Sequence, residues 1–112
     1  MNKLIIVGNV TRDPESRTTP SGKQVCTFSV AVNRNGKEAD KADFFRCTVW
    51  DKLAESCGKY IIKGMKVGVV GRVGLNLYKG NDGETTGQLE VDRIDEVEFL
   101  SRADKEEELL FK

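Results

Sequence analysis

The sequence predicts an all-β fold with one short helix. Five segments have the alternation or the β-branched composition of strands, and one segment with helical spacing lies between the third and the fourth of them. Residues that form turns separate these segments. The chain has 112 residues, a length that suits one domain with its own core.

The first two strands are expected at residues 3–10 and 23–33. The first segment is apolar and β-branched, which predicts a strand buried on both faces. The second alternates, and this predicts one face toward the core. The side chains assigned to that face are Cys26, Phe28, Val30 and Val32.

Two turn regions flank the second strand. Residues 11–22 contain Asp13-Pro14 and Pro20-Ser21-Gly22, so a loop is expected there. The dipeptide Asn35-Gly36 follows the strand and is a strong short-range signal for a hairpin. We therefore expect the second and third strands to be antiparallel neighbours.

The third strand, residues 43–50, has two different faces. Phe45, Cys47 and Val49 share one face and suit a core. The other face carries an aromatic, a basic, a polar and a second aromatic side chain, namely Phe44, Arg46, Thr48 and Trp50. This composition would make a poor core but a good binding platform.

Residues 51–62 place apolar side chains at helical spacing, with Asp51 as the expected N-cap and Gly64 beyond the end. The next strand, residues 65–78, contains Gly68, Gly71 and Gly74, where a bend, a bulge or a close backbone contact is expected. Alternation there assigns Val67, Val69, Val73, Leu75 and Leu77 to the inside, and Arg72, Asn76 and Tyr78 to the outside. After a turn at residues 80–83, the last strand is expected at residues 88–100.

The order of the elements is that of an OB-fold, a five-stranded Greek-key barrel with a helix between strands 3 and 4. An SH3-like barrel or an α+β domain can also place a helix inside a five-stranded meander. The sequence leaves these two alternatives open.

Composition excludes several kinds of active site. The chain has no histidine, so no Ser-His or Cys-His pair and no His-ligated zinc can form. No phosphate-binding glycine motif stands at a strand-to-helix turn. Asp92, Asp95 and Glu96 could hold the metal of a nuclease, but an exposed acidic edge explains them better. We expect a protein that is not an enzyme, with no metal and no cofactor.

The cysteines and the hydropathy indicate a location. Cys26, Cys47 and Cys57 are odd in number and widely spaced, which favours free thiols in a reducing compartment. The longest early aliphatic run has four residues, too few for a signal peptide or a membrane helix. A cytoplasmic protein is expected.

The charges are unevenly distributed although their sum is zero. Residues 1–80 hold 14 basic and 7 acidic residues, whereas residues 81–112 hold 4 basic and 11 acidic ones. A basic body beside an acidic end suggests a polyanion-binding surface. Charges scattered over a neutral surface would be the simpler explanation.

The outward side chains predict binding of single-stranded nucleic acid, because such a strand exposes base faces to aromatic rings and phosphates to basic groups. The candidate rings are Phe44, Trp50 and Tyr78, and the candidate phosphate contacts are Arg34, Arg46, Lys52 and Arg72. Alternatively, Trp50 is a core tryptophan at a strand end and Tyr78 merely flanks the hairpin turn.

The sequence resembles the bacterial and phage single-stranded DNA-binding proteins (SSB). The similarity spans about residues 2–100 in the order of that family. The segments that carry it are Leu4 to Val10, Asp13 to Arg17, Gly22 to Val25, Phe28 to Arg34, Phe44 to Glu55, Lys63 to Val67 and Gly71 to Val73.

The resemblance implies an OB-fold, a homo-oligomer (usually a tetramer) and sequence-independent binding and protection of single-stranded DNA in replication, recombination and repair, which would place the protein with the nucleoid. Phe44 and Trp50 match base-stacking positions of the family, Tyr78 matches its hairpin aromatic, and Arg46 and Lys52 match basic positions. Rival functions are a primosome-type OB protein that acts through protein contacts and a single-stranded RNA binder.

The chain also departs from the family. No aromatic follows Arg34, and the segment Gly74 to Leu77 has fewer basic residues than is common. The resemblance divides the chain into a DNA-binding domain at residues 1–100 and a short acidic and hydrophobic tail at residues 101–112. The tail residues expected to contact replication or repair proteins are Glu106, Glu107, Glu108, Leu109, Leu110 and Phe111. A helix packed on a subunit is the alternative for this tail.

Overall fold

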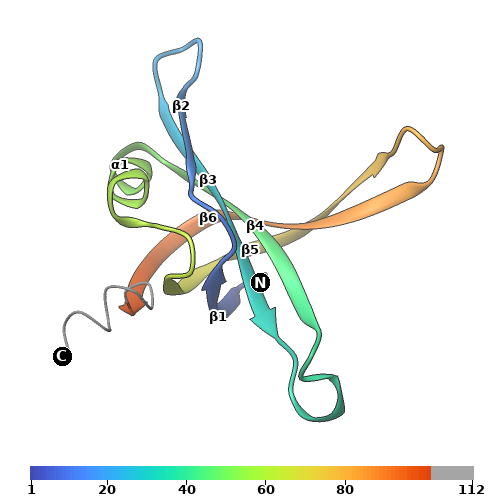
Figure 1. Ribbon diagram of the computed structural model, residues 1–112. Helices are drawn as coiled ribbons and strands as arrows, with labels where there is room; N and C mark the ends of the chain where they lie inside the picture. Colours follow the sequence, from blue (N-terminus) through green and yellow to red (C-terminus); the bar gives the residue numbers. More distant parts are fainter. Residues whose placement is uncertain (102–112) are drawn as a thin grey trace.

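The structure of the protein is a computed structural model that describes residues 1–101 (Figure 1). Its elements follow in the order β1 (Leu4–Val10), β2 (Glu15–Thr18), β3 (Gln24–Asn33), the 3-10 turn η1 (Gly36–Glu38), β4 (Ala42–Trp50), α1 (Asp51–Tyr60), β5 (Lys66–Lys79) and β6 (Thr85–Ser101).

The strands form one sheet that closes into a barrel. Its order is β1-β5-β6-β4-β3-β2, and β1 also pairs with β3 through Asn9↔Ala31 and Val10↔Val30. The pair β4–β6 is parallel, and the other pairs are antiparallel. Five strands thus close a ring, and α1 lies between the third and fourth of them along the chain. This is the OB-fold layout, and the predicted fold class is confirmed.

The core fills the barrel with small and medium apolar side chains. Alternate residues of the strands point inward, and α1 adds Ala54 and Cys57 from one side. The three cysteines are free thiols in this core. Burial, with a smaller effect of the neighbouring thiol, raises the pKa of Cys47 to about 12. The cysteines therefore act as small apolar side chains.

The strand β1 does not match its prediction. Ile6 and Val10 are buried, but Ile5 is 69% exposed and Val7 is 46% exposed. A barrel strand turns only one face toward the core, and no element among residues 1–101 covers the other face of β1. The prediction of a strand buried on both faces is therefore wrong for this chain by itself.

A second difference is β2, which lies inside the predicted loop. Its four residues are all exposed and pair with β3, for example Ser16 with Cys26. No apolar alternation marks such a strand, because its pairing depends on the backbone edge that β3 offers. The predicted hairpin of β3 and β4 does form, but it uses the longer connection of residues 34–41, which contains η1.

The helix begins differently from the prediction. Trp50 is the N-cap residue, without a side-chain cap hydrogen bond. Asp51 is the first helical residue, with φ of 56°, so the prediction of an Asp51 cap is wrong. The helix ends at Tyr60 rather than at residue 62.

The hairpin of β5 and β6 leaves the barrel as a long arm (Figure 1). The register of β5 and β6 shifts between Val70 and Arg72. A Cβ atom at the intervening Gly71 would lie 2.9 Å from Cγ1 of Val91, so the predicted bulge and close contact are confirmed there. Leu75 and Leu77 are exposed, against the prediction, because the arm extends past the core that would have buried them.

Candidate nucleic-acid interface

The outer face of β4 presents the two predicted aromatic rings. Phe44 is 55% exposed and Trp50 is 45% exposed, and Arg46 between them is exposed as well. On the opposite face Cys47 and Val49 are buried. The alternation predicted from the sequence is therefore present, and the strand rise of about 3.3 Å per residue places the two rings about 20 Å apart.

The neighbouring strands extend this face. On one side β3 places Ala31 opposite Phe44 and Ser29 opposite Arg46. On the other side β6 pairs with β4 in parallel, and Nε2 of Gln88 donates an additional hydrogen bond to the carbonyl oxygen of Phe44 at 3.4 Å. The outer face of β4 is thus the centre of a three-stranded surface, and not an isolated row of side chains.

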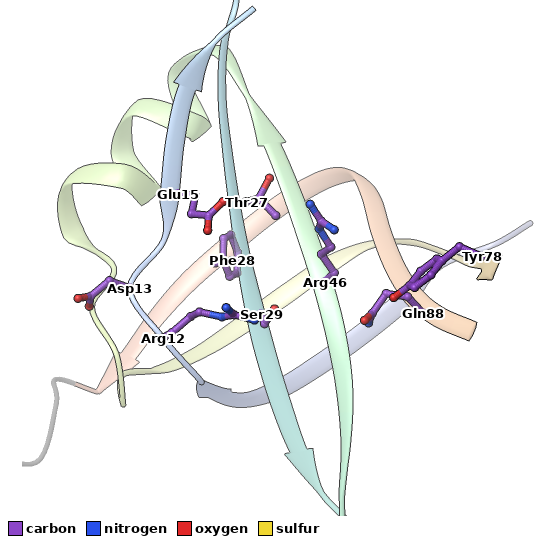
Figure 2. Close-up of a pocket in the computed structure, with 9 residues that line it drawn as sticks. All are labelled: Arg12, Asp13, Glu15, Thr27, Phe28, Ser29, Arg46, Tyr78 and Gln88. Carbon is purple, nitrogen blue, oxygen red and sulfur yellow. The ribbon is translucent and has the colours of Figure 1, made fainter. Parts of the chain in front are cut away.

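The arm of β5 and β6 brings Tyr78 to the same surface. Tyr78 is 48% exposed and pairs in register with Thr86 of β6. It lines a cleft of about 350 Å³ together with Arg46, Ser29 and Gln88. Figure 2 shows Tyr78 and Gln88 side by side at one end of this cleft. Residues 46 and 78, far apart in the chain, therefore share one site.

Trp50 borders a second cleft, of about 520 Å³, beside the turn between β2 and β3. Its other lining residues are Thr19, Ser21, Lys23 and Asp51. Val25 is the cross-strand partner of Trp50 and is buried, so neighbours on the outer face shield it. The indole is thus neither a core side chain nor fully free.

Two of the predicted phosphate contacts are held in ion pairs. Arg34 donates from Nη2 to Oδ1 of Asp43 at 2.8 Å and from Nη1 to Oε2 of Glu38 at 3.0 Å. Arg72 donates from Nε and Nη2 to the two carboxylate oxygens of Asp92. The hydrogen bonds with Asp43 and Glu38 raise the pKa of Arg34, and the hydrogen bond from Arg72 lowers the pKa of Asp92. Their phosphate-binding role stays a prediction.

The remaining predicted residues lie apart from these clefts or outside the described part. Lys52 is exposed on α1 and lines neither cleft described above. The tail residues fall in the segment 102–112, outside the described residues, so their role also stays a prediction.

Sequence reasoning missed Arg12 and Gln88, which line the cleft with Tyr78. Arg12 comes directly after β1, in a segment predicted to be a loop, and nothing local places it beside β3. The pairing of Asn9 and Val10 with β3, continued by the backbone hydrogen bond from Thr11 N–H to the carbonyl oxygen of Ser29 at 3.0 Å, brings it there. Gln88 could have been found from its place at the start of the predicted last strand.

Two negative findings concern residues 1–101. Within this range no three side chains of the metal-ligating types gather in a group that could hold a metal ion. No helix in the same range is long and apolar enough to span a membrane.

The chain matches the model of the single-strand binding protein family over residues 1–100. It is 45% identical over 103 residues to single-stranded DNA-binding protein 3 of Listeria innocua serovar 6a. It is 42% and 43% identical to the single-stranded DNA-binding proteins of Oceanobacillus iheyensis and Bacillus cereus. Each comparison covers 89% of this chain, and the chain spans 60 to 64% of the length of these relatives.

Proposed function

The chain belongs to the single-strand binding protein family, and on this premise we propose that it binds and protects single-stranded DNA without regard to sequence. The observation that carries the proposal is the outer face of β4, where Phe44 and Trp50 expose about half of their surface on either side of Arg46. Bases stack on the two rings and on Tyr78, and phosphates contact basic side chains between them.

The spacing of the rings suits an extended strand. Phe44 and Trp50 lie about 20 Å apart along β4, which leaves room for nucleotides between the two stacked bases. Rings accept every base because each base has a flat π-face, so this surface provides affinity without sequence readout.

We further propose that the protein forms a homo-oligomer, a tetramer in the full assembly. Support comes from β1, which exposes Ile5 and Val7. It pairs over residues 4–9 with β5 along one edge, and along the other edge only Asn9 and Val10 pair, with β3. A row of exposed β-branched side chains on a strand with a free edge is typical of a self-association surface. A second copy of the chain would cover both the face and the edge.

The roles proposed for the molecule are those of a DNA-binding protein in replication, recombination and repair, acting in the cytoplasm at the nucleoid without catalysis. Residues 1–100 form the DNA-binding domain, and residues 101–112 form a partner-binding tail. Deleting residues 104–112 should abolish binding to a replicative helicase or polymerase subunit while oligo(dT) binding persists. Unchanged partner binding would reject the proposed partner-binding role of residues 104–112.

The proposal is tested with the single tryptophan of the chain. Titration with oligo(dT) and oligo(rU) at two salt concentrations, followed by Trp50 fluorescence, should show strong quenching by oligo(dT) that salt weakens. A clear preference for oligo(rU) would favour an RNA binder. No binding at low salt would reject the function and favour a module that acts through protein contacts.

A further inference from the structure

Several arginines lie on or beside the proposed binding surface, and four of them fall into two pairs. Arg34 and Arg72 each donate to carboxylates of the same chain. Arg12 and Arg46 are exposed, and neither forms an ion pair with another residue of the segment 1–101. This division is not visible in the sequence, where all four are simply basic.

The guanidinium of Arg34 is enclosed by two acids. Nε and Nη2 both donate to Oδ1 of Asp43, at 3.1 and 2.8 Å, and Nη1 donates to Oε2 of Glu38 at 3.0 Å. One arginine with two carboxylates leaves the cluster negative in sum. A phosphate approaching Arg34 would meet two like charges at contact distance, so this cluster repels a phosphate rather than binding it.

Arg72 is held in a similar way. It binds the carboxylate of Asp92 with two parallel hydrogen bonds, 3.0 Å and 3.1 Å long, the geometry that an arginine would otherwise offer to a phosphate. Glu90 comes two residues before Asp92 on β6, and its Oε1 accepts a 3.5 Å hydrogen bond from Asn76. This part of the arm is therefore acidic in sum.

Arg12 and Arg46 stand on the cleft that Tyr78 also lines (Figure 2). The backbone around Arg12 is fixed on both sides. Thr11 N–H donates to the carbonyl oxygen of Ser29, and Lys63 N–H donates to Oδ1 of Asp13 at 2.9 Å. Because Ser29 is the cross-strand partner of Arg46, the backbones of both segments meet the same residue of β3.

Three acids lie near this cleft, and none of them forms an ion pair with Arg12 or Arg46 within the segment 1–101. Glu90 of β6 is the register partner of Arg46, but its Oε1 accepts a hydrogen bond from Asn76 instead. Asp13 is turned toward the backbone of Lys63, and Figure 2 shows it pointing away from Arg12. Glu15 of β2 is the register partner of Thr27 on β3. It lines the cleft but forms no ion pair with either arginine in the segment 1–101. The cleft thus keeps two cationic groups available to a phosphate.

We propose that the phosphates of the DNA are bound by Arg12 and Arg46 across this cleft, beside a base stacked on Tyr78, and that Arg34 and Arg72 are retained by their own carboxylates and bind no phosphate. The inference rests on the proposed function and assigns its electrostatic part to two particular side chains, one of which the sequence did not single out.

The test is the salt dependence of oligo(dT) binding. For single strands, each phosphate contact contributes about 0.7 to the slope of log K against log salt. Arg12→Ala and Arg46→Ala should each lower the magnitude of the slope by about 0.7, whereas Arg34→Ala and Arg72→Ala should leave it unchanged. Lys59→Ala on α1 removes the same charge away from the cleft and controls for long-range effects. Thermal unfolding of each variant verifies that it is folded.

A second set of variants keeps every arginine. Glu38→Gln with Asp43→Asn releases Arg34 without shortening any side chain, and it should raise the slope by about 0.7 because a free guanidinium then becomes available. Glu15→Gln should strengthen binding at low salt with the slope of the wild type. These gains of binding cannot arise from misfolding.

The outcomes separate the inference from the function on which it rests. A wild-type protein that fails to bind oligo(dT) at low salt overturns the function and the inference together. The inference alone is overturned if the wild-type protein binds, the slope is reduced in Arg34→Ala or Arg72→Ala, and the slope is unchanged in Arg12→Ala. An unchanged slope after release of Arg34 also contradicts it.

Discussion

At the scale of single residues, the proposed function depends on the aromatic side chains of β4. Phe44 and Trp50 leave much of their apolar surface in water, although large aromatic side chains gain most when buried. Single exposed apolar residues are ordinary on a protein surface, but two rings on one strand face with Arg46 between them form an ordered surface. A base stacked on either ring would cover the apolar surface that the folded chain leaves exposed.

Removing one ring should weaken binding without unfolding the protein. For Phe44→Ala or Trp50→Ala we expect a loss of about 1–3 kcal/mol in oligo(dT) binding, the usual contribution of a stacked base. Tyr60→Ala is the matched control, because Tyr60 is similarly exposed but lies against Phe99, with ring centroids 6.1 Å apart. Fluorescence anisotropy of labelled oligo(dT) measures the difference, and equal losses for Phe44 and Tyr60 would contradict the assignment.

The ion pair of Arg72 and Asp92 predicts a pH dependence of stability. The hydrogen bond from Arg72 lowers the pKa of Asp92 in the folded state, so the unfolded chain binds a proton more readily. The stabilisation of the folded state by the ionised Asp92 is complete above the ordinary aspartate pKa of about 3.9. It is lost as the pH falls through the lowered pKa of Asp92.

Asp92→Asn isolates this effect, because a neutral amide resembles the protonated acid. The variant should be less stable than the wild type at about pH 6, and the difference should shrink as the pH falls below about 3.9 and vanish below the lowered pKa of Asp92. Urea unfolding at a series of pH values measures it. A difference that persists unchanged at low pH would show that the carboxylate charge is not responsible.

At the scale of the elements, the bulge in β5 shapes the arm that carries Tyr78. The register shift between Val70 and Arg72 bends the strand, as bulges do, and the arm then leaves the barrel (Figure 1). Gly71 lies at the shift against β6, where a Cβ atom would come within 3.0 Å of the carbonyl oxygen of Asp92. The backbone contact, rather than unusual dihedral angles, requires glycine there.

Two glycines of the same strand make a matched pair. Gly71→Ala should destabilise the fold by about 1–3 kcal/mol, the usual cost of overpacking. Gly74→Ala should have little effect, because apart from Gly74 and its two chain neighbours no atom of residues 1–101 lies within 4 Å of the position that its added methyl group would take. Guanidinium unfolding of both variants gives the two free energies, and equal values would show that the close contact at Gly71 does not matter.

At the scale of the whole molecule, the surfaces proposed for DNA binding and for self-association are different. The rings proposed to stack on bases lie on the outer face of β4, whereas the exposed apolar side chains Ile5 and Val7 lie on β1, which is paired with β5 and only briefly with β3. The two strands stand at different places in the ring order of the sheet. An oligomer can therefore form through β1 while the β4 face stays open to DNA.

A charge on the uncovered face of β1 should prevent self-association. Ile5→Lys and Val7→Lys should each reduce the mass measured by analytical ultracentrifugation, because the lysine would be buried unpaired in the interface. Leu77→Lys, at an equally exposed apolar position on the arm, controls for the added charge. Unchanged mass for both β1 variants would exclude this face from the interface.

The alternation of residues 43–50 was enough to predict which side chains of β4 face outward, because alternation is a property of the local backbone. The local pattern of residues also predicted the five barrel strands in their chain order, the helix between the third and fourth of them, and a bulge or close contact in the glycine-containing strand, which is present at Gly71. It missed β2. The prediction failed at β1, since an apolar composition predicts burial on both faces whether or not another element covers the second face.

Sequence by itself therefore predicted the OB-fold, the family resemblance and the outward aromatic face of β4, all of which depend on local pattern or on ordered motifs, and the pairing of β1 with β3 closes the barrel. Only the tertiary structure decided which arginines are available. Arg34 follows β3 and meets Asp43 of the paired β4, Arg72 meets Asp92 across the β5–β6 ladder, and Arg12 reaches the cleft through a bond between the end of β1 and β3. Such charge pairing depends on the register between distant segments, which no local pattern encodes.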